Sequence, residues 1–382
     1  MRKIIVRLRE RSYPVLIGQN LLSFIGSLLR PLKFGPKILV VSNKNIAKRD
    51  LKNEFAKLKI SLARAGYEVV EPYLFRYADE RDKSQRSLFE LWKHMARHQL
   101  ERSSAVLAFG GGVVGDISGL AASTYMRGIS VVQIPTTLLA QVDASIGGKT
   151  GIDLPSAKNI VGTFYQPRMV IADVKLLEKL GRLRPRELRN GFAEVIKYGM
   201  IQDAKLFKLL ERKAARFFSL LKEKKLGRGE ISLLETIVWR SANVKAKVVE
   251  EDERETRGKR MILNYGHTFA HAFEAASKYK LPHGEAVGLG MAAAARLARR
   301  RGMIGVDIVR RQNDLIDSVG LPTQLDGRTL HSNRVIHHML LDKKKRNGRL
   351  RFVLPLAVGR VKVVEGVSLS EVKKVLTDLG GQ

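Results

Sequence analysis

Three histidines and one glutamate are the residues whose spacing most directly suggests chemistry. His267 and His271 stand four positions apart in a segment with a helical pattern, so both rings leave the same face of that helix. His283 follows at a Leu-Pro-His-Gly turn, and Glu194 lies upstream in GFAEVIKYG. Neutral imidazole together with a carboxylate is a common ligand set for zinc-like divalent ions. The histidine pair alone is as typical of a helix surface, but with His283 and Glu194 it favours a metal site.

Lys197 stands three residues after Glu194 in an otherwise apolar helical segment. A charged pair on such a face is costly to bury unless it has polar partners. The pair therefore strengthens the case for a functional site there.

The glycine-rich run GGGVVGD (110–116) follows an apolar strand and precedes a helix expected to begin near Ile117. Glycines at the carboxyl end of a strand let backbone amides approach a phosphate, and the next helix N-terminus favours its negative charge. The run matches neither GxGxxG nor the P-loop pattern. We interpret it as a phosphate or dinucleotide site, with a structural turn as the alternative.

A second polar segment, 144–162, carries Lys149, Lys158 and Asn159 among glycines, with Asp143 just before it. Its apolar periodicity is too weak for a core element, so we expect a loop that crosses a cleft. Lysine and asparagine side chains there would hold phosphate or carboxylate oxygens, and Lys149 would also reach a cofactor. A solvated loop is the alternative. Two hydroxyl donors stand nearby at a strand end, Thr136 and Thr137.

These residues need a scaffold, and the first half of the chain alternates strands with helices. Apolar runs predict strands at 37–43, 67–75, 104–112 and 129–137, with helices at about 46–65 and 84–99. The first 18 residues alternate apolar and charged side chains like an edge strand. Such alternation indicates a parallel sheet with helices on both faces, an arrangement that often binds nucleotides.

From about residue 185 the strand signal fades. Helices are expected at 187–220, 230–250, 264–278, 284–301 and 305–319, with short strands in 350–364 and a last helix at 370–379. We therefore predict an α/β nucleotide-binding domain at 1–183 and a mostly α-helical domain at 184–382. Two domains also suit a chain of 382 residues.

Composition excludes several classes of protein. Cysteine is absent, so there is no disulfide framework, thiolate metal site or thiol nucleophile, which suits a reducing compartment such as the cytoplasm. Since neither a signal peptide nor a run of about twenty apolar residues is found, no membrane association is expected.

The net charge of +32 raises the possibility of nucleic-acid binding. However, the basic residues are scattered, without interleaved aromatic side chains or a DNA-reading motif. A solvated basic surface that attracts an anionic substrate explains the charge more simply, so no specific nucleic-acid partner is expected.

Taken together, the motifs resemble those of the 3-dehydroquinate synthase family. They include GGGVVGD, QIPTTLLAQVDASIGGKTG, KNIVGTFYQP, RELRNGFAEVIKYG, LNYGHTFAHAFE, HGEAVGLGM and DKKKRNGRLRFVLP, and they follow the family's order between about residues 37 and 356. The resemblance implies an N-terminal domain that binds NAD. It also implies a helical domain that holds one divalent metal, with Zn²⁺ expected and Co²⁺ as the alternative, and a homodimer.

The reaction implied by the resemblance converts 3-deoxy-D-arabino-heptulosonate 7-phosphate to 3-dehydroquinate and phosphate. It is a carbon–oxygen lyase step of the shikimate pathway, which leads to chorismate and the aromatic amino acids. NAD is used catalytically: a ring hydroxyl is oxidised, phosphate leaves, the ketone is reduced again, and ring opening precedes an aldol closure.

Matching the motifs residue by residue assigns roles. The metal ligands are Glu194, His267 and His283. The catalytic residues are His271, which shuttles a hydroxyl proton relayed through Glu255, and Lys149 and Lys197. The substrate contacts are Arg127, Asp143, Asn159, Lys245, Arg260, Asn264 and Lys344. The NAD contacts are Asn43, Glu80, Lys83, Gly112, Val113, Val114, Gly115, Asp116, Thr136, Thr137, Lys149, Lys158 and Lys179.

The chain departs from the family pattern at a few positions. Ala78-Asp79-Glu80 replaces Asp-Gly-Glu, Ala270 replaces a glycine, and Lys179 stands where a threonine often contacts NAD. About three extra residues follow Lys179, and one more lies between Glu255 and Arg260. None of these changes removes a predicted metal ligand or acid–base group.

Three other functions compete with this interpretation. Other sugar-phosphate cyclases share NAD and metal but act on substrates without a carboxylate, whereas Lys245, Arg260 and Asn264 favour an acidic one. A metal-dependent alcohol or glycerol dehydrogenase needs no phosphate or carboxylate clamp. A basic nucleic-acid-binding protein on this scaffold would be expected to have lost its catalytic residues.

Overall fold

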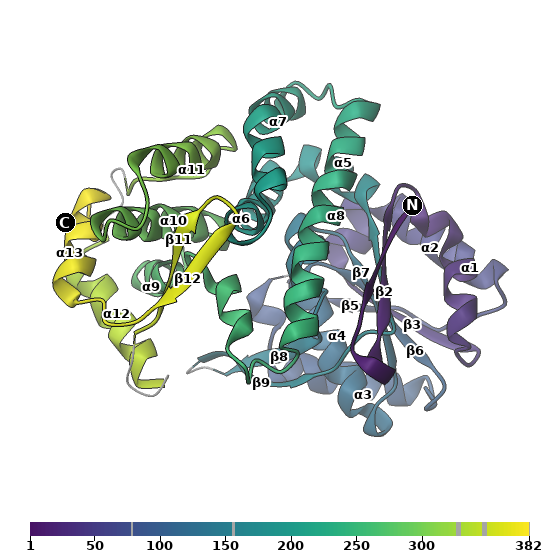
Figure 1. The fold of residues 1–382 in the computed structure, drawn as a ribbon. Helices are drawn as coiled ribbons and strands as arrows, with labels where there is room; N and C mark the ends of the chain where they lie inside the picture. Colours follow the sequence, from purple (N-terminus) through teal and green to yellow (C-terminus); the bar gives the residue numbers. More distant parts are fainter. Residues whose placement is uncertain (78, 155–156, 326–329, 346–349, 382) are drawn as a thin grey trace. The chain divides into compact units, whose positions relative to one another are not determined.

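The structure is a computed structural model that describes residues 1–77, 79–154, 157–325, 330–345 and 350–381, without the side chains of 342–345. Its chain groups into two compact units (Figure 1). Unit 1 comprises Met1–Leu188 and Leu226–Arg254, and unit 2 comprises Arg189–Lys225 and Glu255–Gln382. The sequence-based division at 183 and 184 stays a prediction of domain limits. The structure differs from it in grouping 226–254 with the first unit.

Unit 1 is built on a mostly parallel eight-stranded sheet in the order β1-β2-β10-β7-β6-β3-β4, with β5 also paired to β3. Only β1 runs antiparallel to its neighbour, at the edge of the sheet, as the alternating N-terminus suggests. The strands are β1 (Arg2–Val6), β2 (Tyr13–Gly18), β3 (Lys37–Asn43), β4 (Glu68–Val69), β5 (Tyr73–Phe75), β6 (Ala105–Gly110), β7 (Ser130–Pro135) and β10 (Met169–Asp173).

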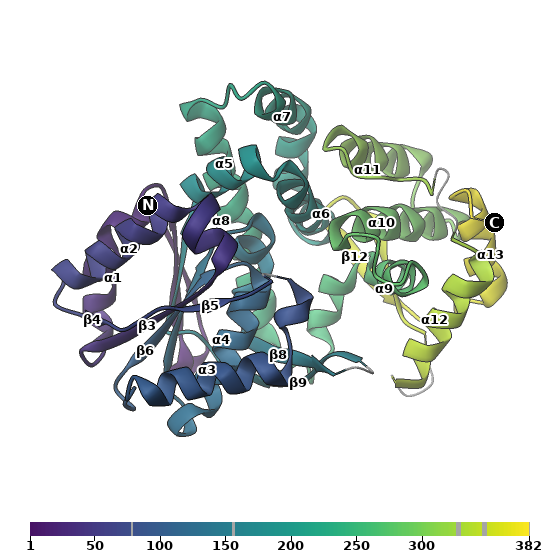
Figure 2. The same ribbon diagram turned by 180° about the vertical axis from the view of Figure 1, so that it is seen from behind.

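Helices cover both faces of this sheet because its central strands are apolar on both sides. On β3, Ile38 and Val40 join one buried cluster, while Leu39 and Val41 join the other. The first cluster lies under α1 (Ile25–Leu29), α2 (Lys52–Arg64) and α5 (Val174–Leu183). The second lies under α3 (Gln85–Arg97) and α4 (Gly112–Thr124), and Figure 2 shows both groups of helices around the strands. The long helix α8 (Arg228–Glu251) packs against β1, β2 and α5.

Unit 2 is largely helical, with α10 (His283–Arg300) at its centre. Nearly every residue of α10 from Gly284 to Ala298 is buried, because α9, α11, α13 and β11 pack around it. Its other elements are α6 (Pro185–Ile201), from Arg189 onward, α7 (Ala204–Lys222), η8 (Lys259–Asn264), α9 (His267–Ala276), α11 (Val306–Ser318), α12 (Ser332–Lys345), β11 (Phe352–Ala357), β12 (Arg360–Val364) and α13 (Leu369–Asp378). Of the described helices, none combines the length and apolarity needed to cross a membrane.

The predicted fold class is confirmed, but several predicted elements were wrong. The helix expected near Ile117 begins at Gly112, because Gly111 takes an extended N-cap conformation and the glycines continue into the first turn. The loop expected at 144–162 is mostly a hairpin of β8 (Lys149–Leu154) and β9 (Ala157–Phe164). The helix expected at 187–220 is two helices, and the strand at 67–75 is also split. Both β10 and α12 were missed.

Candidate metal centre and nucleotide site

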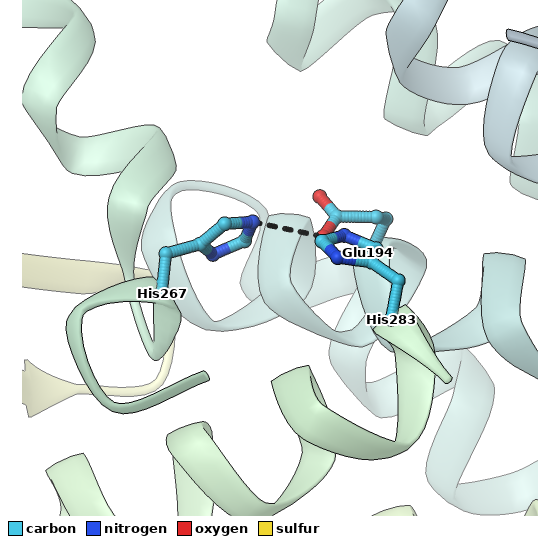
Figure 3. Close-up of side chains that lie close together, drawn as sticks. All are labelled: Glu194, His267 and His283. Carbon is cyan, nitrogen blue, oxygen red and sulfur yellow. Dashed lines mark ion pairs between the residues drawn. The ribbon is translucent and has the colours of Figure 1, made fainter. Parts of the chain in front are cut away.

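Glu194, His267 and His283 come together in unit 2 although they lie on three helices (Figure 3). Glu194 is on α6, and the two histidines are the first residues of α9 and α10. One potential ligand atom from each lies within 4.8 Å of the others. The Nε2 atoms of His267 and His283 stand 3.4 Å and 3.7 Å from Oε1 of Glu194. The predicted ligand set is therefore compact in space.

Two close backbone approaches bring these helices together. A Cβ on Gly284 would lie 2.3 Å from Cα of Asn190, so only glycine lets the start of α10 sit directly on α6. A Cβ on Gly290 would lie 2.1 Å from the carbonyl oxygen of Gly266, the residue before α9. Because His283 adjoins Gly284 and His267 adjoins Gly266, these two contacts fix both imidazoles beside Glu194.

Backbone and side-chain acceptors orient the histidine rings. Nδ1 of His267 lies 3.1 Å from the carbonyl oxygen of Tyr265, which leaves Nε2 to face Glu194. Nδ1 of His283 lies 3.2 Å from Oε1 of Glu274 on α9, with the same result. Such acceptors behind an imidazole are typical of metal-binding histidines, since they fix the ring and raise its basicity.

Glu194 is almost fully buried and is surrounded by positive or protonatable groups. Burial raises the pKa of its carboxyl, but the Lys197 ammonium and His267 outweigh burial and hold that pKa well below its usual range. Lys197 is buried too, forms an ion pair with Glu194 and lies over the ring of Tyr198. For His283, burial favours the neutral ring, yet Glu194 and Glu274 raise its pKa to about 10.

The residues fit a divalent metal. Both carboxylate oxygens of Glu194 are buried: Oε2 is paired with the Lys197 ammonium, and Oε1 faces the Nε2 atoms of His267 and His283 at 3.4 Å and 3.7 Å. A metal ion between Oε1 and the two imidazoles would replace these long contacts with direct bonds. Two imidazoles and one carboxylate are also a donor set that Zn²⁺ accepts while keeping a position open for substrate.

The acid–base and anion-binding residues predicted for unit 2 lie close to His267 in the sequence. His271 is exposed one turn along α9, and its ring centroid is 5.5 Å from that of His267. Arg260 is buried in η8, with Nε 3.4 Å from Oε1 of Glu255. Glu255 itself has a left-handed backbone, with φ of 57°. Asn264 ends η8 and is half-buried.

In unit 1, the glycine-rich run forms the turn from β6 into α4, so Gly112, Val113, Val114 and Gly115 all lie in the first turn of the helix. A Cβ on Gly115 would lie 2.7 Å from Oε1 of Gln133, whose amide donates to the Gly115 carbonyl, so a larger residue would displace this side chain. Amides at a helix N-terminus attract phosphate.

A cavity opens beside this turn, at the carboxyl ends of β3, β6 and β7. Parallel α/β sheets bind ligands at this edge. One part of its lining is apolar and the other carries hydroxyl, amide and charged groups. The lining residues are Asn43, Ile46, Asp50, Gly111, Thr136, Thr137, Leu138, Leu177, Leu180, Gly181, Arg184, Glu187 and Leu188. Thr136 Oγ1 is buried and has no hydrogen-bond partner among the described residues. An unpaired hydroxyl, an apolar wall and a helix N-terminus together fit a dinucleotide.

A polar cluster in unit 1 joins five predicted site residues through two lysine–carboxylate pairs. Lys83 Nζ lies 2.7 Å from Oδ2 of Asp116 and also donates to Asn159 on β9. Lys245 Nζ, from α8, lies 2.5 Å from Oδ1 of Asp143. Burial lowers the pKa of Lys83, but Asp116 outweighs this effect and raises it. Burial raises the pKa of Asp116, and the charge of Asp143 adds to that rise.

Glu80 and Lys158, two further predicted residues, lie near this cluster. Burial raises the pKa of Glu80, while the charges of Lys83 and Lys158 oppose that rise. Lys149 is the first residue of β8 and is exposed.

Three predicted residues are not brought into these clusters. Arg127 is exposed in the turn after α4, with φ of 63°. Lys179 points from α5 to Glu54 on α2, with its Nζ 2.8 Å and 3.0 Å from the carboxylate oxygens, and it is not among the described residues that line the cavity. The side chain of Lys344 lies outside the described residues. Their assigned roles remain predictions.

Several residues of these sites were missed from the sequence. Asp50, Leu177 and Leu180 line the cavity from ordinary helical segments that contain no motif, and Arg184 does so from the connection between α5 and α6. Glu274 gave a weak signal, since it follows His271 by three positions and so shares a helix face with it.

Comparison with known proteins agrees with this architecture. The family model described as 3-dehydroquinate synthase N-terminal matches residues 74–189, and that described as 3-dehydroquinate synthase C-terminal matches residues 191–345. The chain is 43% identical over 374 residues to a 3-dehydroquinate synthase of Rippkaea orientalis, covering 97% of each chain. It is 44% identical over 376 residues to one of Nostoc sp. (strain PCC 7120), covering 98% of each.

Solved structures of cyclases share the fold. ValA, a 2-epi-5-epi-valiolone synthase from Streptomyces hygroscopicus subsp. jinggangensis with NAD⁺ and Zn²⁺ bound, matches with a TM-score of 0.84 at 30% identity over 98% of each chain. A 2-deoxy-scyllo-inosose synthase matches with a TM-score of 0.80 over 99% of each chain, but at 24% identity it supports the fold alone. Since both family models and near-full-length relatives match, this chain belongs to the 3-dehydroquinate synthase family.

Proposed function

We propose that this chain catalyses conversion of 3-deoxy-D-arabino-heptulosonate 7-phosphate to 3-dehydroquinate and phosphate, with NAD as a catalytic cofactor and one divalent metal. The observation that carries this proposal is the 43–44% identity to 3-dehydroquinate synthases along nearly the whole chain, against 30% to a cyclase of another substrate. Each polar cluster described above contains residue types that this chemistry needs.

The metal would be held by Glu194, His267 and His283. When bound, it supplies a Lewis acid for a substrate oxygen, and NAD supplies a reversible hydride acceptor. The chain's own contribution is to fix these groups. Tyr265 and Glu274 orient the imidazoles, and the first turn of α4 offers amides to a pyrophosphate.

Proton transfer is assigned to His271. The ring is exposed and neighbours that of His267, so a substrate hydroxyl near the metal centre lies within its reach. Glu255 is proposed to relay the proton. Its carboxylate lies 3.4 Å from Nε of Arg260, which positions it beside the predicted substrate contacts of η8.

Anion recognition is assigned to the buried cations. Arg260 and Lys245 are both buried, and each already lies beside a carboxylate of this chain. If each cation also contacts a substrate carboxylate, substrates that lack this group forgo that contact. These side chains therefore favour the acidic seven-carbon sugar phosphate over sedoheptulose 7-phosphate, and Lys149, Lys197, Asn159 and Asn264 would contribute further polar contacts.

The test is phosphate release from 3-deoxy-D-arabino-heptulosonate 7-phosphate with NAD and Zn²⁺, run beside sedoheptulose 7-phosphate and beside a chelated sample. Turnover of the first substrate alone, lost on chelation and without net NADH, is expected. Release from sedoheptulose 7-phosphate alone would instead assign the protein to another branch of the cyclases. NADH that accumulates from simple polyols would indicate a dehydrogenase.

A homodimer and a cytoplasmic location are part of the proposal. The dimer is supported by β9, which is exposed along almost its whole length and pairs on one side with β8. Ile160, Val161 and Phe164 are 59%, 42% and 42% exposed there. An open apolar edge strand is usually covered, and a second copy would pair with it. Val161→Lys should yield a monomer in sedimentation analysis, and an unchanged dimer would locate the interface elsewhere. The cytoplasmic location rests on the biosynthetic role of the family.

A further inference from the structure

The cavity beside the glycine turn carries two charged side chains that lie outside the family motifs, Asp50 and Arg184. Asp50 comes from the short helical segment η4 (Ile46–Asp50) and Arg184 directly follows α5, while the third charged lining residue, Glu187, belongs to the RELRNGFAEVIKYG motif in the first turn of α6. Arg184 follows the few residues that this chain adds to the family pattern after Lys179. These two side chains are therefore a feature of this chain that requires its own explanation.

The Asp50 carboxylate is paired with two guanidinium groups, one on each oxygen. Nη2 of Arg184 lies 2.6 Å from Oδ2 of Asp50, and Nε of Arg49 lies 2.9 Å from Oδ1 of Asp50. The Asp50 carboxylate is only 7% exposed, whereas Arg184 is 37% exposed. The positive charge nearest the cavity is thus already matched by a carboxylate, and Glu187 adds a second negative charge to the lining.

The other residues that line the cavity indicate how an adenosine nucleotide would bind there. Leu138, Leu177, Leu180 and Leu188 offer an apolar wall suited to a flat base. Gly111, at the N-terminus of α4, offers the amides suited to a phosphate. The ribose that joins base to phosphate then meets the charged side chains of the lining, and its 2′ position is where NAD and NADP differ.

We infer that the Asp50–Arg184 pair makes this cavity select NAD over NADP. The inference rests on the proposed function, since it assumes that the cavity holds the adenosine of the cofactor. A 2′-phosphate would have to approach Asp50 and Glu187, while Arg184, the residue type that commonly binds such phosphates, is held by Asp50. A neutral 2′-hydroxyl meets no such repulsion and can donate to a carboxylate.

The test is fluorescence titration of the full-length protein with NADH and NADPH, which needs no turnover. In Asp50→Asn, Arg184 is released, so the ratio of the NADPH to the NADH dissociation constant should fall about tenfold, as expected when one like charge beside a phosphate is removed. In Arg184→Gln, the carboxylate remains without its main partner, so the same ratio should rise. A purely structural role for the pair would move both variants in the same direction.

Glu178→Gln is the matched control. It also removes one carboxylate from the α5 region and releases an arginine, Arg182, but neither residue is among the described residues that line the cavity. Its ratio should equal that of the wild type. An unchanged ratio in Asp50→Asn, or an equal fall in Glu178→Gln, overturns the inference while leaving the cofactor assignment intact. A wild-type protein that binds neither nucleotide overturns the cofactor assignment itself.

Discussion

The buried charges of the two units are paired in different ways. In unit 1 each buried lysine has its own carboxylate: Lys83 pairs with Asp116, and Lys245 with Asp143. In unit 2 one carboxylate, Glu194, is shared by Lys197 and two histidines. The ion pairs of unit 1 can therefore be removed one at a time, whereas the positive and protonatable groups of unit 2 share the carboxylate of Glu194.

This difference determines how strongly the stability of each cluster depends on a bound ligand. Matched pairs leave little net charge, so the cluster of unit 1 is stable as a scaffold and a ligand only has to exchange hydrogen bonds with it. In the cluster of unit 2, Oε1 of Glu194 and the two imidazoles meet only at 3.4 Å and 3.7 Å, so this cluster gains most when a metal cation binds between them. Unit 2 should thus be the more sensitive to loss of its ligand.

The largest effect should come from His267→Ala, which removes one of three proposed metal ligands. Phosphate release should fall about 10³-fold, since a Lewis acid contributes several kcal/mol to such a step. Metal content, measured by mass spectrometry after dialysis, should fall as well. The rise in melting temperature that Zn²⁺ gives the wild type should also disappear.

The control for this variant is His331→Asn, which alters an exposed histidine of the same unit. It should keep its metal, its activity and its melting temperature. Chelation of the wild type should reproduce the phenotype of His267→Ala. If His267→Ala keeps its metal, and its activity within tenfold of the wild type, then unit 2 does not depend on the metal in the way proposed.

An intermediate effect is expected when the lysine–carboxylate pair of unit 1 is broken. Lys83→Met leaves Asp116 without its ammonium and should lower the free energy of unfolding by about 2–3 kcal/mol. This is less than the roughly 3–5 kcal/mol for a fully buried pair, because Asp116 is 23% exposed. The double variant Lys83→Met with Asp116→Asn should recover much of the loss, because no lone charge remains.

The same design in unit 2 should fail, and this contrast tests the comparison directly. In Lys197→Met with Glu194→Gln the two histidines lose the carboxylate that they face, so the double variant should recover little of the loss caused by Lys197→Met. Urea unfolding measures both series. Equal recovery in the two units would mean that the charges of unit 2 are also separable.

Parts of the fold and of the site could be predicted from the sequence where the residue type itself indicates the role. Histidines and a glutamate have few reasons to gather except ligand binding, so residue types alone grouped Glu194 with His267, His271 and His283. The family resemblance then singled out Glu194, His267 and His283, and these three do lie together. The buried strand β3 was predicted at its observed limits because a continuous apolar run has few other uses.

The features that were missed depend on contacts between distant parts of the chain. The hairpin of β8 and β9 was taken for a loop because glycines and lysines dominate it, and pairing between the strands outweighs that composition. Asp50 and Arg184 are ordinary charged residues until the fold places them 2.6 Å apart. No local sequence pattern predicts such an ion pair.

The smallest effect should come from Glu274→Gln, which changes the support of a ligand rather than a ligand. Glu274 accepts from Nδ1 of His283 at 3.2 Å and so aims Nε2 at the centre. The glutamine keeps size and an acceptor oxygen but removes the charge that makes the ring basic. Metal affinity should therefore fall about 10- to 100-fold, while the metal-free protein should unfold at nearly the wild-type urea concentration. Chelator competition measures the first quantity. Glu211→Gln, which removes a carboxylate from an ion pair with Arg311 elsewhere in unit 2, should change neither. A loss of stability without a loss of metal affinity would show that Glu274 acts only in packing, and the contrast between a self-sufficient cluster and a ligand-dependent one would then rest on Glu194 alone.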